Sequence, residues 1–258
     1  KTTLPVPARL YHKSRMPKVM FLAVVGRPRP EYEFDGKIGL WVFATERLAE
    51  RSDSRTGTVR GETTIIVDVK IDAKAYLEKI VGEGGVFDMM RKKMPWFHKD
   101  SGKPEAGHPL HYQHDGARPH TAKANEPVYV KEGRKFGFDI RVRVQPAQKM
   151  EFNFCDLAFF RSLQSDVVTH DKTTKKDLIR VVRRCFAEYD FKRMDACCRS
   201  LITAYIGNLE TGGDNNYNMH RGTRKATAQG IFDLSVAKSV VDGAKVKLAE
   251  LKKEAEKP

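Results

Sequence analysis

The chain has 258 residues, of which 40% are hydrophobic and 31% are charged. These are the values of a globular protein, so they exclude wholesale disorder, and the length is sufficient to bury one main core. Lysine and arginine number 47 against 33 aspartates and glutamates, which gives a formal net charge of +14 and favours a polyanionic partner. A basic surface that serves no such partner is the alternative interpretation.

Neither a membrane span nor a disulfide framework is expected. No apolar run approaches the ~20 residues that a membrane-spanning helix needs. The cysteines show no paired CxxC spacing for zinc, and two of them are adjacent, which disfavours disulfide pairing and favours a reducing intracellular compartment. They are Cys155, Cys185, Cys197 and Cys198.

The first part of the chain is predicted to form strands. Residues 1–17 hold three prolines and are expected to be irregular, with residues 8–12 completing a hairpin whose first half is missing. The valine-rich run Lys18–Val25 predicts a strand buried on both faces, and Ile38–Phe43 predicts its antiparallel partner. Residues 50–61 predict an exposed loop, and residues 63–71 predict a strand or extended arm.

A helical pattern precedes the most informative stretch. Asp72 is expected to cap a helix whose apolar spacing continues, after an interruption at residues 82–85, as far as Met94. A loop over residues 96–108 then leads into LHYQHDGARPHTA, residues 110–122. This stretch runs from apolar and aromatic residues into Asp115, after which Gly116 turns the chain. It therefore predicts a strand that presents Asp115 at the edge of a sheet.

The second half combines one strand with several helices. Residues 124–137 are expected to form a connector, and residues 138–144 a strand on which Arg141 and Arg143 share one face. Glu151 opens the helix-compatible run EFNFCDLAFF. Amphipathic helices are expected from residue 173 to 190 and over residues 193–209, and a charged helical tail over residues 223–258.

Asp115 and Glu151 are the candidate metal ligands. About 35 residues separate them, which is enough for a loop, one strand and a return to the same sheet edge. Two carboxylates there could converge on one divalent cation, since Mg²⁺ and Mn²⁺ prefer carboxylate oxygens. By itself Asp115, which precedes a glycine, is typical of a turn cap. The Glu151 block favours the ligand interpretation.

The residues QHDGARPH, followed by PAQKMEFNFCDLAFF, resemble the second and third blocks of the mariner-like DDE transposases, in particular the plant and oomycete type. Residues 18–43 also resemble the segment that precedes those blocks, and the similarity covers about residues 10–220. The resemblance implies an α/β, ribonuclease-H-like fold over residues 1–222, with a mixed central sheet flanked by helices. It implies that Asp115 and Glu151 are catalytic ligands of Mg²⁺ or Mn²⁺.

The resemblance also implies a function and its partners. The activity would be metal-dependent DNA cleavage and strand transfer on double-stranded DNA in the nucleus, by a homodimer that holds transposon ends. Two ions about 4 Å apart activate the attacking hydroxyl or water and stabilise the leaving oxygen. Arg118, His120, Arg141 and Arg143 are the candidate phosphate contacts. Ordinary solvent-exposed or packed side chains are the alternative for these four residues.

Three departures from the family pattern weaken the enzymatic expectation. The strand that carries the family's first catalytic aspartate is absent from this sequence, and Asp68 is expected to be a solvated residue rather than its substitute. Lys149 and Met150 precede Glu151 where the family has Ser-Pro before its acid, and His114 stands where glutamine is common. The chain as given is therefore expected to be inactive. A non-catalytic nucleic-acid-binding derivative and a metal-dependent ribonuclease-H-like nuclease are the alternative functions.

Overall fold

In the computed structural model, the described residues are 17–213, apart from 55, 122 and 173, together with residue 245. The chain is mixed α/β and divides into two compact units. Unit 1 comprises residues 1–145 and 162–190, and unit 2 comprises residues 146–161 and 191–258. The predicted hairpin half at residues 8–12, the helical tail and the boundary at residue 222 lie outside the described residues.

The described strands pair two by two, and all of them belong to unit 1. They are β1 (Phe21–Val25), β2 (Lys37–Val42), β3 (Ala44–Leu48), β4 (Thr64–Asp68), β5 (Pro109–His114) and β6 (Asp139–Val144). The pairs β1–β2 and β3–β4 are antiparallel, whereas β5–β6 is parallel. The α/β class is thus confirmed, while these ladders do not join into the single mixed sheet of the ribonuclease-H-like prediction.

Helices are found in both units. Unit 1 contains α1 (Ala73–Val81), α2 (Val86–Lys93), α3 (Glu126–Lys135) and α5 (Lys175–Glu188), with the short helices η2 (Pro30–Tyr32) and η3 (Pro95–Phe97). Unit 2 contains η4 (Met150–Phe152), the π-helix η5 (Cys155–Phe159) and α6 (Phe191–Glu210). Helix α4 (Phe160–Val168) begins in unit 2 and continues in unit 1. No described helix is long and apolar enough to cross a membrane.

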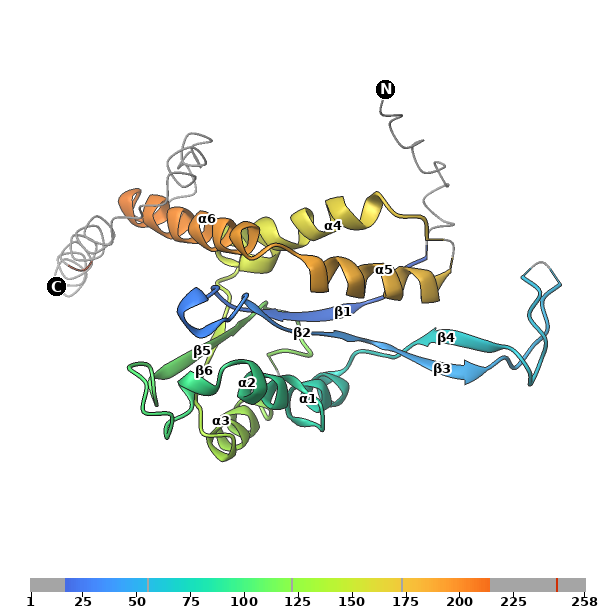
Figure 1. The fold of residues 1–258 in the computed structure, drawn as a ribbon, viewed down its shortest axis with the longest axis horizontal. Coiled ribbons are helices and arrows are strands. Elements are labelled where there is room, and N and C mark those ends of the chain that lie inside the picture. Colours follow the sequence, from blue (N-terminus) through green and yellow to red (C-terminus); the bar gives the residue numbers. More distant parts are fainter. Residues whose placement is uncertain (1–16, 55, 122, 173, 214–244, 246–258) are drawn as a thin grey trace, which may run out of the picture. The chain divides into compact units, whose positions relative to one another are not determined.

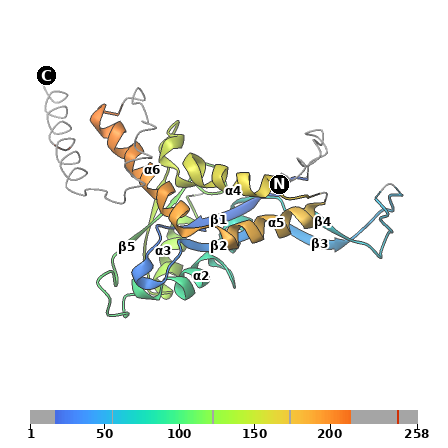
Figure 2. The same cartoon turned by 45° about the horizontal axis from the view of Figure 1, so that its top comes forward.

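Strands β1 and β2 form the predicted antiparallel pair and are covered on both faces. None of their residues is exposed, and β2 contacts both α2 and α5. In Figure 1, α5 lies on one side of this pair and α2 on the other, and Figure 2 shows α5 running alongside it. Lys37 fixes the contact with α5, because its buried ammonium group donates hydrogen bonds to the carbonyl oxygens of Ala187 (2.6 Å) and Tyr189 (2.9 Å).

One apolar core joins β1–β2 to the helices α1 to α3 and to the β5–β6 pair. Its largest fully buried side chains include Tyr76, Phe87, Tyr129, Phe138 and Ile140. Large aromatic side chains each bury a large apolar area, so they contribute strongly to the stability of a core. The strand that leads into Asp115 is therefore held in place by the main core of unit 1.

The break between α1 and α2 follows the sequence prediction. The side chain of Asp72 accepts a hydrogen bond from the amide of Ala75 at 2.9 Å and so caps α1. The helix ends at Gly82, and α2 starts after Gly85. A methyl group on Gly85 would lie 2.6 Å from the carbonyl oxygen of Gly82, so only glycine fits this close turn.

Helix α3 corrects the prediction that residues 124–137 form a connector. Pro127 suits its first turn, where a backbone amide has no helical partner. Gly133 lies inside the helix, and a Cβ atom there would be 2.3 Å from Cγ1 of Ile140 in β6. The glycine therefore lets α3 approach the sheet closely, and β5, α3 and β6 form one parallel crossover unit.

Strand β3 was not predicted, and it pairs with β4 in an exposed hairpin. Four of its five residues are exposed, and in Figure 1 the hairpin extends away from the other strands of unit 1. The strand expected over residues 63–71 is shorter than predicted. It ends at Asp68, whose carboxylate pairs with the ammonium group of Lys175 at 2.6 Å.

In unit 2, the predicted helix begins after Glu151 rather than at it. Glu151 lies in η4, which ends at Asn153, and the π-helix begins after Phe154. The Asn153 side chain accepts a hydrogen bond from the amide of Cys155 at 3.0 Å and donates one to the carboxylate of Asp156 at 2.9 Å. Helix α6 packs on both η4 and η5, with the rings of Phe152 and Tyr205 4.7 Å apart.

Candidate functional site

Asp115 lies directly after β5, at the carboxyl end of the parallel pair. The last register pair of that ladder is His114 with Val144. In open α/β sheets, ligands bind outside the carboxyl ends of parallel strands, because the loops that leave this edge converge there. The position of Asp115 at a sheet edge is therefore the position that the sequence pattern predicts.

Two hydrogen bonds fix one oxygen of the Asp115 carboxylate. Its Oδ1 atom accepts from the amide of Ala117 at 2.9 Å and from Nδ1 of His120 at 2.5 Å. Among the described residues, none forms a hydrogen bond with Oδ2. The side chain is 45% exposed, so the carboxylate is oriented by one oxygen and presents the other to solvent.

His120 is itself held by the core. Its ring lies 4.1 Å from that of Tyr76, which is 1% exposed. The Tyr76 hydroxyl group is in turn 3.0 Å from that of Tyr112 in β5. Burial raises the pKa of Tyr76 well above its usual value, so the tyrosine stays neutral. The imidazole that orients Asp115 is therefore supported by a buried pair of aromatic side chains.

His114 points into the protein and stays neutral. Its Nδ1 atom lies 2.9 Å from the backbone carbonyl oxygen of Asp115, and since a carbonyl only accepts, Nδ1 carries the proton. The ring is buried, and its Nε2 atom has no hydrogen-bond partner in the described part of the chain. Burial lowers the pKa of His114, because a proton on Nε2 would be an unsatisfied buried donor.

The arginines predicted to contact phosphates are exposed. Arg118 lies on the turn that follows Asp115 and forms no ion pair with any described residue. Arg141 pairs with Asp139 at 3.0 Å, and Nε of Arg143 lies 3.2 Å from Nδ1 of His111. Arg141 and Arg143 do share a face of β6, as their alternation predicts.

That shared face of the parallel pair is polar. His111 stands beside Arg141 in the register, and Gln113 stands beside Arg143, and all four side chains are exposed. Strands of parallel sheets are usually buried on both faces. An exposed face with two arginines, a histidine and an amide offers hydrogen-bond donors to an anion.

Glu151 is partly buried in η4, and no described residue forms a hydrogen bond or ion pair with its carboxylate. Lys149, two residues before it, donates a hydrogen bond to the carbonyl oxygen of Gly213 at 3.0 Å. Asp115 belongs to unit 1 and Glu151 to unit 2. The convergence of the two carboxylates therefore stays a prediction.

No metal-binding cluster is formed within the described part of the chain. None of its groups of three or more histidine, cysteine, aspartate or glutamate side chains is arranged to hold an ion. Asp68 is exposed and paired with Lys175, in a different sheet from Asp115. The structure thus contains one oriented carboxylate at a sheet edge, and the Mg²⁺ or Mn²⁺ site stays a prediction.

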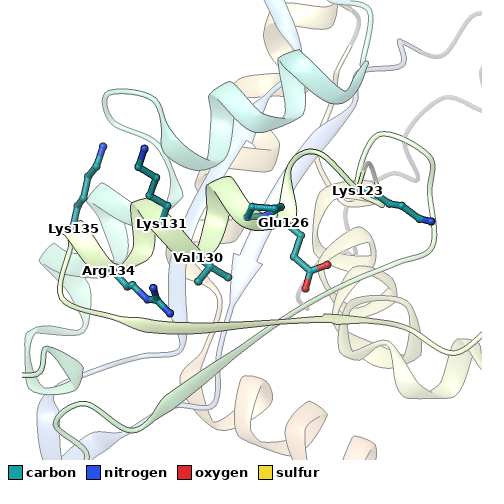
Figure 3. A pocket seen from close by; sticks show the side chains of 7 residues that line it. Lys123, Glu126, Val130, Lys131, Arg134 and Lys135 are labelled. Atoms are coloured by element: carbon teal, nitrogen blue, oxygen red, sulfur yellow. The ribbon is translucent and has the colours of Figure 1, made fainter.

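A basic pocket on α3 has no counterpart among the predicted sites, because the sequence pattern predicts a connector over residues 124–137. Its lining, shown in Figure 3, is Lys123, Glu126, Pro127, Val130, Lys131, Arg134 and Lys135. Residues three and four positions apart are neighbours on a helix surface. In a helix, this spacing places the charged side chains of residues 126–135 next to one another.

Comparisons of the chain with protein-family models, with curated proteins and with solved structures find no match. The resemblance to mariner-like transposases therefore rests on the sequence blocks around Asp115 and Glu151.

Proposed function

We propose that this chain is a catalytic-domain segment of a mariner-like transposase that binds double-stranded DNA and contributes Asp115 and Glu151 to a divalent-metal site. The observation that carries the proposal is the Asp115 carboxylate, which is oriented through Oδ1 at the carboxyl end of β5 and open at Oδ2. A metal-binding carboxylate is commonly oriented by a hydrogen bond to its second oxygen. The assembled protein would act in the nucleus as a homodimer on transposon ends.

The donor chemistry at Asp115 fits a hard cation. Mg²⁺ and Mn²⁺ take carboxylate oxygens, and the exposed Oδ2 atom is of that type. When bound, such ions lower the pKa of the attacking water or hydroxyl and stabilise the charge on the leaving oxygen. Within this chain, His120 holds the carboxylate in place, and the exposed Arg118 on the same turn supplies positive charge for a phosphate group.

A second candidate is a DNA-binding protein of the same origin that lacks catalysis. The observation that favours it is that the described residues form no group of three side chains that could hold a metal ion. Two carboxylates alone do not complete a site for two ions. The net charge of +14 would then serve DNA binding alone.

The metal part of the proposal is tested by calorimetric titration of Mn²⁺ into the wild-type protein and into Asp115→Asn. The matched control is Asp68→Asn, because Asp68 is also an exposed aspartate in unit 1 but lies on another sheet. The proposal predicts weaker binding in Asp115→Asn and unchanged binding in Asp68→Asn. Equal Mn²⁺ affinity in all three proteins would show that Asp115 is not a metal ligand.

Incubation of the protein with a labelled duplex and Mg²⁺ separates the two candidates. Metal-dependent nicking that is lost in Asp115→Asn supports the catalytic candidate. Salt-dependent duplex binding without nicking fits both candidates, because the chain as given is expected to be inactive, and Mn²⁺ binding at Asp115 then separates them. A chain that neither binds nor nicks a duplex would contradict both.

A further inference from the structure

A second charged surface, apart from the Asp115 turn, lies on the outer side of α3. We name this surface the α3 basic face, and it consists of Lys123, Lys131, Arg134 and Lys135 around Pro127 and Val130. The four cations are exposed, and Glu126 is the one acid that lines the same pocket. Glu126 lies in the first turn of α3, where a negative charge also stabilises the helix.

The packing of α3 explains why these charges face outward. On the opposite side of the helix, Tyr129 and Gly133 are buried, and Gly133 lies against Ile140 of β6. The basic side chains therefore belong to the side that the core leaves exposed. Figure 3 shows Lys131 and Lys135 extending to one side of the helix axis, whereas Arg134 extends to the other.

Most of this charge is not neutralised by the residues that the structure describes. Lys135 pairs with Glu132 at 2.7 Å, but Lys123, Lys131 and Arg134 form no ion pair with any described residue. The exposed face of β6 differs in this respect, since its Arg141 is already paired with Asp139. The α3 basic face is therefore the better prepared of the two surfaces to accept a polyanion.

The spacing of the face suits a nucleic-acid strand. A helix of ten residues is about 15 Å long. Each strand of a DNA duplex carries one phosphate per ~3.4 Å of axis, so about four phosphates lie along such a helix. Three cations of the face, Lys131, Arg134 and Lys135, lie within this helix, and Lys123 precedes it. Pro127 and Val130 are the apolar residues that line the pocket, and the other lining residues are charged.

We propose that the α3 basic face binds the phosphodiester backbone of double-stranded DNA without sequence preference. This inference rests on the DNA-binding part of the proposed function and names a surface for it that is separate from Asp115 and Glu151. Binding of this kind releases counterions from the duplex, so each phosphate contact adds about 0.9 to the slope of log affinity against log salt. The α3 basic face should therefore contribute to this slope in proportion to the number of phosphate contacts that it makes.

The test measures fluorescence anisotropy of a random-sequence duplex at several salt concentrations. The variant is Lys131→Gln with Arg134→Gln, and the matched control is Arg91→Gln with Lys92→Gln, an exposed Arg and Lys pair in the last turn of α2. Loss of two phosphate contacts predicts roughly 10-fold weaker binding and a salt slope that is smaller by about 2 in the α3 variant. The α2 control should keep the wild-type slope.

Two results would overturn the inference, and they are distinguishable. If the wild-type protein binds the duplex with a steep salt dependence but the α3 variant behaves like the α2 control, only the assignment of the face fails. If the wild-type protein shows no salt-dependent binding, the DNA-binding part of the proposed function fails as well.

A measurement on the wild-type protein removes any dependence on variant folding. Acetic anhydride labels exposed lysines, and a bound duplex should protect Lys123 and Lys131 while Lys92 keeps its reactivity. Equal labelling of all three lysines with and without the duplex would contradict the proposal.

Discussion

The Nδ1 atom of His120 lies 2.5 Å from Oδ1 of Asp115, five residues earlier in the chain. A carboxylate oxygen accepts hydrogen bonds, so Nδ1 donates and carries a proton. The ring of Tyr76, which packs against the imidazole in a tilted arrangement, restricts it. As a result, the orientation of an exposed carboxylate at a sheet edge depends on a histidine that is anchored in the core of unit 1.

Replacement of His120 by alanine should weaken Mn²⁺ binding by about 10- to 100-fold without abolishing it, because outer-shell partners orient a ligand rather than supply it. Calorimetric titration measures the change. His111→Ala is the control, since His111 is an exposed histidine on β5 that contacts Arg143 rather than Asp115. Equal affinities of the His120 variant and the wild type would show that Asp115 needs no orienting partner.

Protonation of His114 should destabilise the fold. Its pKa is lowered in the folded state, so between the folded pKa and the unfolded value of ~6.5 the unfolded chain binds more protons. The stability difference between the wild type and His114→Gln should thus be constant above pH ~6.5 and shift in favour of the variant as pH falls below it. Urea unfolding at several pH values measures this difference. A pH-independent difference would contradict the buried neutral imidazole.

Gly133→Ala should lower the free energy of unfolding by about 1–3 kcal/mol, although alanine favours helices, because the added methyl group overpacks the contact with Ile140. Gly116→Ala is the control. No atom lies within 4 Å of a Cβ at Gly116, so that variant should differ from the wild type by less than about 1 kcal/mol. Denaturant unfolding compares the two variants, and a stabilised Gly133→Ala would show that α3 does not approach the sheet as described.

Lys37→Met should destabilise unit 1 by about 2–3 kcal/mol, since the buried carbonyl oxygen of Tyr189 and the partly buried one of Ala187 both lose the Lys37 donor. The same replacement at the exposed Lys18 supplies the control. Thermal unfolding should show a lower melting temperature for the Lys37 variant alone. Equal melting temperatures would mean that the end of α5 is solvated rather than bound by Lys37.

Local features were predictable because they depend on neighbouring residues. The cap at Asp72, the break between α1 and α2, the strand that ends at Asp115 and the shared face of Arg141 and Arg143 all follow from short-range patterns. Local capping also explains an error, because Asn153 rather than Glu151 begins the helical segment.

Other features depend on tertiary contacts that periodicity does not encode. Helix α3 contains Gly133, which disfavours a helix locally and is explained only by its contact with Ile140. Strand β3 has an exposed, polar surface and no alternating apolar pattern, so its pairing with β4 could not be read from its own residues. The proposed convergence of Asp115 and Glu151 on one ion would be a relationship of the same kind, and it stays a prediction.

The most direct test of that relationship is a double-mutant cycle on Mn²⁺ affinity with Asp115→Asn, Glu151→Gln and the double variant. If both carboxylates bind one ion, each single variant should weaken binding at least ~10-fold, the scale of losing even an outer-shell partner. The double variant should then be little weaker than either single one. A silent Glu151→Gln, or two effects that simply multiply, would contradict a shared site.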